Sequence, residues 1–104
     1  METLHISLLD GFEDEVVILK VNDQEVYHKK ELFSKLIRGY ADSLEVQVDE
    51  GEVKVEFILP ERNLEETITL KILSPIYLGL SIHHDKIQYK ASLEPLIKTE
   101  KDSQ

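Results

Sequence analysis

The chain has 104 residues and carries 12 Lys and Arg against 21 Asp and Glu, for a formal net charge of −9, with no cysteine. This length suits one domain, and the lack of cysteine excludes disulfides and thiolate metal sites. The acidity disfavours nucleic acid and anionic membranes as partners, because both present phosphate. No apolar run approaches the about 20 residues that span a membrane. The first residues also lack the basic start and apolar run of a signal peptide, so we expect a cytoplasmic protein.

The first third of the chain alternates apolar and polar residues, a pattern typical of β-strands. Residues 4–8 alternate in this way, and residues 15–21 form a run rich in β-branched side chains. Asn22-Asp23 follows, and both residue types tolerate the positive φ of a tight hairpin turn. The pairs predicted from a two-residue turn are Leu19 with Val26, Ile18 with Tyr27, and Lys20 with Glu25. This register sets Tyr27 beside Ile18 on the outward face.

Residues 29–38 are compatible with a short helix or with an irregular strand that crosses between sheets. The apolar residues that would share one helical face are Leu32, Phe33, Leu36 and Ile37. Gly39 would then serve as the C-cap. Because short apolar segments fit either structure, the sequence predicts at most one short helix, near residues 30–38.

Residues 44–57 predict a hairpin folded at Glu50-Gly51, where glycine supplies a positive φ. The inward pairs would be Leu44 with Phe57, Val46 with Val55, and Val48 with Val53. The outward face would then set Glu45 directly opposite Glu56. Such a like-charged pair destabilises by roughly a few tenths of a kcal/mol when it is exposed.

Several interpretations of the Glu45–Glu56 pair stay open. Water and salt screen the two charges, or the acidic face binds a basic partner protein, or its oxygens collect Ca²⁺. No calcium-loop motif supports the last interpretation. Opposed carboxylates could also share a proton in an enzyme if they were buried, but Gln47, Asp49 and Lys54 on the same face argue against burial.

The second half of the chain continues the period-two alternation. A corner is expected at residues 60–63, and a strand with Ile68, Leu70 and Ile72 on one face follows it. Ser74-Pro75 breaks this run, and residues 76–82 form the next strand. A turn at His84-Asp85 predicts a further set of pairs: Ile82 with Ile87, Leu80 with Tyr89, Ser81 with Gln88, Gly79 with Lys90, and His83 with Lys86.

Together these patterns predict an all-β fold. Short strands at this spacing favour a single antiparallel β-sandwich of about eight strands that is rich in hairpins, with a small barrel as the alternative. Residues 1–97 would form the β-sandwich domain. Residues 98–104 are polar and are expected to be a disordered tail.

A series of short segments resembles a known kind of domain: LLDGFEDEV, VNDQEVYHK, ADSLEVQVDEG, VKVEFILPERN, YLGLSI and LEPL, in that order. The pattern is similar to small uncharacterised bacterial β-sandwich domains. A looser similarity links it to transthyretin-like and carboxypeptidase-regulatory-type sandwiches. The resemblance rests on turns and core positions and implies a fold but no activity. Asp23 stands where such hairpins usually carry glycine.

Catalytic and metal-binding motifs are missing from the sequence. No serine lies in a nucleophile elbow, and the four glycines are too isolated for a phosphate loop. Zinc requires three or four converging ligands, whereas His83 and His84, as neighbours on a strand, would point to opposite faces. We therefore predict no catalytic residue, no metal site, no cofactor and no enzymatic activity.

Two surfaces remain as candidates for binding. Val16 and Ile18 lie on the face opposite the inward residues of their strand, and with Tyr27 they would form an apolar patch, either covered within the chain or free to bind. We predict a non-enzymatic protein-interaction module whose partner is another protein or a second copy. Val16, Ile18 and Tyr27 would anchor the partner, while Glu45 and Glu56 would select it. The alternative is a module that binds calcium or carbohydrate on an acidic sheet face.

Overall fold

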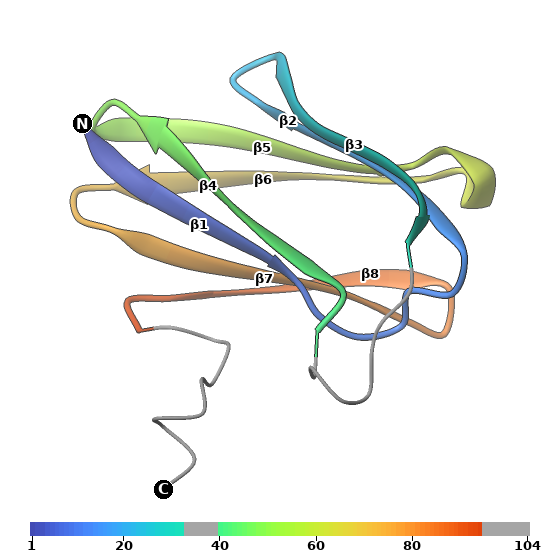
Figure 1. Cartoon of the computed structure of the whole chain (residues 1–104). Helices are drawn as coiled ribbons and strands as arrows, with labels where there is room; N and C mark the ends of the chain where they lie inside the picture. The colour runs from blue at the N-terminus through green and yellow to red at the C-terminus, as the bar shows by residue number, and fades with distance from the viewer. Residues whose placement is uncertain (33–39, 95–104) are drawn as a thin grey trace, which may run out of the picture.

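The computed structural model describes residues 1–32 and 40–94, and Figure 1 shows them as two stacked β-sheets. The eight strands are β1 (Glu2–Leu8), β2 (Glu15–Val21), β3 (Gln24–Leu32), β4 (Asp42–Val48), β5 (Gly51–Leu59), β6 (Leu64–Ile72), β7 (Ile76–His83) and β8 (Lys86–Ser92). A 3₁₀ turn, η1 (Pro60–Arg62), joins β5 to β6. One sheet has the order β4-β1-β7-β8 and the other β3-β2-β5-β6. The predicted all-β sandwich of about eight strands is confirmed.

The core lies between the two sheets and is built from alternate residues of each strand, as period-two patterning requires. The central strands β1, β2, β5 and β7 supply most of its fully shielded side chains. These include Leu4, Ile6, Leu8, Val17, Leu19, Val53, Val55, Phe57, Leu59, Leu78 and Leu80. The rings of Phe12 and Phe57 also meet there, with centroids 6.1 Å apart. The period-two alternation predicted for these strands is therefore confirmed.

The prediction of a hairpin at Glu50-Gly51 is wrong. β4 pairs with β1 in one sheet, while β5 pairs with β2 and β6 in the other, so the connection between β4 and β5 crosses from sheet to sheet. Glu45 lies opposite His5, and Glu56 lies opposite Lys20 on one side and Thr67 on the other. The alternation of residues 44–57 specifies two faces but no partner, and the observed pairing sets Glu56 against a positive charge.

The hairpin between β2 and β3 is confirmed at its turn but not along its whole length. Asn22 and Asp23 adopt φ of 50° and 68°, so aspartate fills a position where glycine is usual, and Lys20 lies opposite Glu25 as predicted. The register then shifts by one residue between Leu19 and Lys20, which sets Leu19 opposite Tyr27. Because a bulge reverses the faces beyond it, the prediction that Tyr27 points outward is wrong.

The hairpin between β7 and β8 is confirmed in full, with every predicted pair present. His84 and Asp85 adopt φ of 52° and 60°, which suits this turn. Tyr89 lies opposite Leu80 as predicted, yet its exposed fraction is 54% because β8 is an edge strand. The sandwich is also not purely antiparallel, since β1 and β7 run parallel as direct neighbours.

The ambiguous segment at residues 29–38 is described only in part. Residues 29–32 belong to strand β3, so the strand interpretation holds there. Leu32, the first residue of the predicted helical face, is thus in a strand, while the other three residues of that face lie outside the described residues. The same is true of residues 95–104, which include the predicted end of the domain and the polar tail.

Gly11 lies where the β1–β2 connection passes close to the backbone of strand β7. Its φ is +88°, and a Cβ placed on it would collide with the backbone carbonyl of Ile82. Nearby, the Ile82 N–H donates to the Asp10 carbonyl over 2.9 Å. Gly51, with φ of +121°, has nothing near its would-be Cβ. The two glycines thus share a positive φ that favours glycine, but they differ in the space around them.

We expect Gly51→Ala to lower the free energy of unfolding by about 1–3 kcal/mol, from backbone strain alone. Gly11→Ala should cost about 1–3 kcal/mol more, because the added methyl group also overpacks. Urea denaturation of both variants measures the difference. Equal losses would contradict the close approach at Gly11.

Candidate functional site

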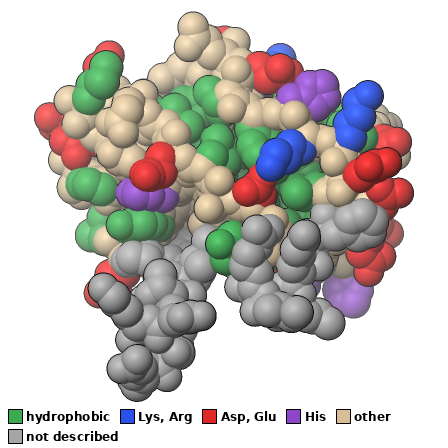
Figure 2. Space-filling view, viewed as in Figure 1, with side chains coloured by type: hydrophobic (Ala, Val, Ile, Leu, Met, Phe, Trp, Pro, Cys, Tyr) green, Lys and Arg blue, Asp and Glu red, His purple; other side chains and the backbone are tan. Residues whose placement is uncertain are grey.

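The two open edges of the sandwich differ. β6 and β8 approach each other closely at one edge, whereas β3 and β4 approach less at the other. At the β3–β4 edge the inward residues Val26, Leu44 and Val46 are only partly buried, although they pack against the core. Figure 2 shows hydrophobic side chains at the surface between these two strands. Inward residues of β6 and β8, including Leu64, Leu70 and Ile87, are also partly buried, so the β3–β4 edge differs in that its two strands approach each other less.

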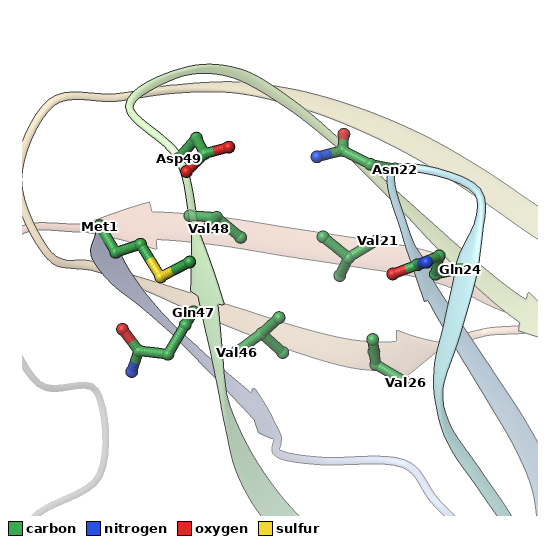
Figure 3. Close-up of a pocket in the computed structure, with 9 residues that line it drawn as sticks. All are labelled: Met1, Val21, Asn22, Gln24, Val26, Val46, Gln47, Val48 and Asp49. Carbon is green, nitrogen blue, oxygen red and sulfur yellow. The ribbon is translucent and has the colours of Figure 1, made fainter.

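A pocket of about 160 Å³ lies at this edge, and we call it the edge pocket. It is lined by Met1, Val21, Asn22, Gln24, Val26, Val46, Gln47, Val48 and Asp49. In Figure 3 the valines of β2 and β3 face those of β4, and Asn22 and Asp49 lie at one end. A cavity of about 150 Å³ holds one benzene-sized group, while ligand sites usually measure about 300–1,000 Å³. The edge pocket therefore suits one side chain.

Further along the same edge, Tyr27, Lys29 and Asp42 join the two sheets, and we call them the inter-sheet clasp. The Tyr27 hydroxyl donates to Asp42 Oδ2 over 2.9 Å, and Lys29 Nζ donates to the same oxygen over 2.6 Å. The Ser43 N–H donates to Asp42 Oδ1 over 2.9 Å. Tyr27 therefore connects the sheets from inside the edge and does not anchor an outward patch.

The charge environment of Asp42 favours its ionised form. Partial burial raises the pKa of this carboxyl, but the hydrogen bonds from Lys29, Tyr27 and the Ser43 N–H together outweigh burial, so the pKa lies below its ordinary value. Lys29 Nζ also lies 5.8 Å from the centroid of the Tyr27 ring. The clasp thus holds a carboxylate between a cation and a phenol.

The outward face of β2 and β5 carries three of the five predicted partner-binding residues. Val16 and Ile18 are half-buried there, and Ile18 lies directly opposite Ile58, which the sequence analysis did not single out. Glu56 lies on the same face, opposite Lys20. We call Val16, Ile18 and Ile58 the outer aliphatic patch. The signal that could have found Ile58 is its position between the inward residues of β5.

Salt bridges border the outer aliphatic patch. Lys54 Nζ lies 2.6 Å from Asp23 Oδ1 and 3.8 Å from Glu56 Oε1. The hydrogen bond and the charge of Lys54 lower the pKa of Asp23. Asn22 also ties the β2–β3 turn to β5, since its side-chain oxygen accepts from the Lys54 N–H over 3.0 Å. Lys54, Asp23 and Glu56 are thus already paired within the chain.

Glu45 lies on the outward face of the other sheet, so it does not lie opposite Glu56 as predicted. Its Oε2 is 3.9 Å from His5 Nδ1. His5 in turn stacks on Tyr77, with ring centroids 4.2 Å apart and an interplanar angle of 13°. The acidic face built from Glu45 and Glu56 therefore does not exist. The stack could not be predicted, because it depends on the parallel pairing of β1 with β7.

One end of the sandwich is closed by an ion-pair network that the sequence analysis missed. Glu15, only 4% exposed, accepts from Arg62 Nη2 over 2.6 Å and from Arg62 Nε over 3.0 Å. Arg62 Nη1 also donates to Asp85 Oδ1 over 2.6 Å. We call these three residues the end lock. It joins β2, η1 and the β7–β8 turn. Its signal in the sequence is the acidic residue that directly precedes the apolar run of residues 16–19.

Residues 1–32 and 40–94 contain neither a cluster of metal ligands nor a membrane-spanning helix. No group of three or more His, Asp or Glu side chains in these ranges could hold a metal ion. His83 and His84 are exposed at the β7–β8 turn. Within the same ranges, no helix has the length and apolarity needed to cross a membrane.

Comparisons with known proteins return no relative. No family model matches the chain, no curated protein matches it, and no solved structure matches it.

The titration of Asp42 tests the inter-sheet clasp. A carboxyl with a lowered pKa stabilises the fold above its unfolded pKa, and this contribution is lost as pH falls through the folded pKa. We expect the Asp42 midpoint to lie below its ordinary 3.8 and to move toward it in Lys29→Met and Tyr27→Phe. Carboxyl NMR measures the midpoint. Lys30→Met is the matched control on the same strand, and a midpoint insensitive to Lys29 and Tyr27 would contradict the clasp.

The end lock gives a second expected outcome. Arg62→Met leaves the Glu15 carboxylate buried without its cation, which should cost about 3–5 kcal/mol of unfolding free energy. Adding Glu15→Leu to that variant should restore most of the loss, because no buried charge remains. Asp85→Asn, at an exposed position, should cost no more than about 1 kcal/mol. Thermal melts compare the three. A small loss of unfolding free energy in Arg62→Met would show that the buried Glu15 carboxylate does not depend on this cation.

Proposed function

We propose that the chain is a non-enzymatic protein-interaction module that contacts its partner through the outer aliphatic patch. The observation that carries this proposal is the adjacency of Val16, Ile18 and Ile58 on the outward face of two central strands, β2 and β5. An antiparallel sheet that faces water normally presents polar side chains outward. Aliphatic residues gathered at the centre of such a face favour an interaction surface.

The outward face of the other sheet provides a contrast within the same molecule. There β1 and β4 present polar residues in register: Thr3 opposite Gln47, His5 opposite Glu45, and Ser7 opposite Ser43. The two outward faces share the same architecture but differ in side-chain chemistry. This difference supports the assignment of the partner to the face of β2 and β5.

The surroundings of the patch match the anatomy of a protein interface. Such interfaces have an apolar centre and a polar rim. Here Lys20, Glu56 and Lys54 lie beside the aliphatic residues, and the side chain of Glu56 is only 18% exposed. Rim charges contribute specificity and association rate more than affinity. On this surface, Glu56 is therefore the residue proposed to select the partner. Tyr27 and Glu45 do not lie on it.

Two pockets lined by described residues are small. The edge pocket measures about 160 Å³, and a second pocket above Gly79 on β7 measures about 190 Å³. Both fall below the about 300–1,000 Å³ of usual small-molecule sites. The net charge of −9 favours a basic partner over a second copy, because two copies repel each other.

A carbohydrate ligand is the alternative function. The acidic face with Glu45 beside Glu56, on which the expectation of carbohydrate or calcium binding rested, does not form. The stack of Tyr77 on His5 nevertheless places aromatic surface on an outward sheet face beside Gln47 and Thr3. A glycan array on the wild type and Tyr77→Ala would test this alternative.

Two further proposals concern kinship and location. The two-sheet architecture supports the resemblance to transthyretin-like and carboxypeptidase-regulatory-type sandwiches and to small bacterial β-sandwich domains. The cysteine-free composition supports a cytoplasmic setting, where thiols stay reduced and disulfides are rare.

The double variant Ile18→Lys/Ile58→Lys tests the proposed function. We expect it to fold, to bind the partner at least about tenfold more weakly, and to show any self-association of the wild type abolished. Partner capture and sedimentation velocity measure the two effects. The matched control is Thr67→Lys/Thr69→Lys, which adds the same charges to the same sheet face on β6. Identical binding by the wild type and the patch variant would refute the proposal.

A further inference from the structure

We propose that the β3–β4 edge accepts an extended, basic segment of another protein as an added strand beside β4, with one aliphatic side chain in the edge pocket. This surface lies apart from the outer aliphatic patch, so the inference goes beyond the proposed function. Edge strands present unpaired backbone groups that a partner strand can use.

Incomplete burial at this edge is the first argument. Leu4 and Leu19, on central strands, are fully shielded, whereas Val26, Leu44 and Val46 at the edge are only partly buried. At the opposite edge Leu64, Leu70 and Ile87 are also partly buried, but β6 approaches β8 there more closely than β3 approaches β4. Within the described residues, the β3–β4 edge therefore has apolar surface that an added strand would cover.

The position of the edge pocket is the second argument. Its walls come from both sheets, with Val46 and Val48 of β4 on one side and Val21 and Val26 on the other (Figure 3). Side chains along a strand alternate between faces. A strand added beside β4 would therefore direct every second side chain between the sheets. The volume of about 160 Å³ accommodates one of them.

The regularity of β4 is the third argument, because it favours β4 over β3 as the receiving strand. β4 pairs with β1 from Asp42 to Val48 without a register shift. β3 has two shifts in its register with β2, and Glu31 in it has φ of 54°. Bulges and charged side chains are devices that block pairing at a sheet edge. β3 carries both, and β4 carries no bulge.

Charge identifies the chemistry of the occupant. Asp49 lies on the rim of the edge pocket with the amides of Asn22, Gln24 and Gln47. Glu50 follows it directly in the chain. Neither acid has an ion pair with another residue in the described ranges. An aliphatic floor with an acidic rim fits a segment in which Lys or Arg flanks Val, Ile or Leu.

The probe is a blocked nine-residue peptide in which valine alternates with threonine and lysines stand at both ends. It is titrated into the isotope-labelled full chain and followed by NMR. We expect shifts at β4 and the edge pocket, together with slower hydrogen exchange of β4 amides. The same peptide with glutamate in place of lysine should bind at least about tenfold more weakly.

Variants locate the site. Val46→Lys places a charge in the edge pocket and should weaken binding at least about tenfold. Asp49→Lys, at an exposed turn position, tests the charge without disturbing the core and should weaken binding about fivefold or more. Leu70→Lys is the matched control, a partly buried aliphatic residue at the opposite edge, and should leave the affinity unchanged.

Four results would overturn the inference: no shifts at millimolar peptide, equal binding of the glutamate peptide, shifts centred on β6 and β8, or shifts centred on the outer aliphatic patch. Concentration-dependent protection of β4 in the chain alone would also overturn it, because the occupant would then be a second copy. Ile18→Lys/Ile58→Lys should bind the peptide normally, which separates this inference from the proposed function.

Discussion

Mutual burial of two sheet faces is the constraint on which the rest of the structure depends. The central strands satisfy it completely, as the full shielding of Ile6, Leu19, Phe57 and Leu80 shows. An edge strand has a neighbour on one side only, and some of its inward residues, such as Val26, Leu44 and Val46, are only partly buried. The edges and ends of the sandwich are therefore where polar contacts must replace apolar packing, and where surface is left for a partner.

The inter-sheet clasp and the end lock both follow from this constraint. Each holds a carboxylate, Asp42 or Glu15, and the link from one sheet to the other is made by Tyr27 and Lys29 on Asp42 in the clasp and by Arg62 on Asp85 in the lock. A carboxylate removed from water is costly unless it is paired and hydrogen-bonded, so these contacts tolerate few changes. Between the clasp and the β2–β3 turn, the same edge is lined by valines and left open as the edge pocket. The outer aliphatic patch is different, because its residues point away from the core.

Local turn chemistry explains why some of the architecture was predictable. The His84-Asp85 turn pairs β7 with β8 in the register that the sequence indicates. A two-residue turn with two positive φ angles, together with the alternating pattern, allows only this register. Asn22-Asp23 does the same for the first pairs of β2 and β3. The single extra residue at Val26 then reverses the faces, and a bulge has no sequence signature of its own. Tyr27 was misplaced for that reason, while Val16, Ile18 and Glu56 kept their outward positions.

The sequence by itself determined where most of the strands lie, that Asn22-Asp23 and His84-Asp85 close hairpins, and which residues of β2 and β5 point inward. These are properties of neighbouring residues, set by period-two alternation and by side chains that tolerate positive φ. Only the tertiary structure decided that β4 pairs with β1 and not with β5, and that β1 runs parallel to β7. It also decided that Glu45 lies opposite His5 and not opposite Glu56. An alternating strand can pair with any other strand of matching pattern. The choice among partners depends on which arrangement buries all the apolar faces at once, and no single segment carries that information.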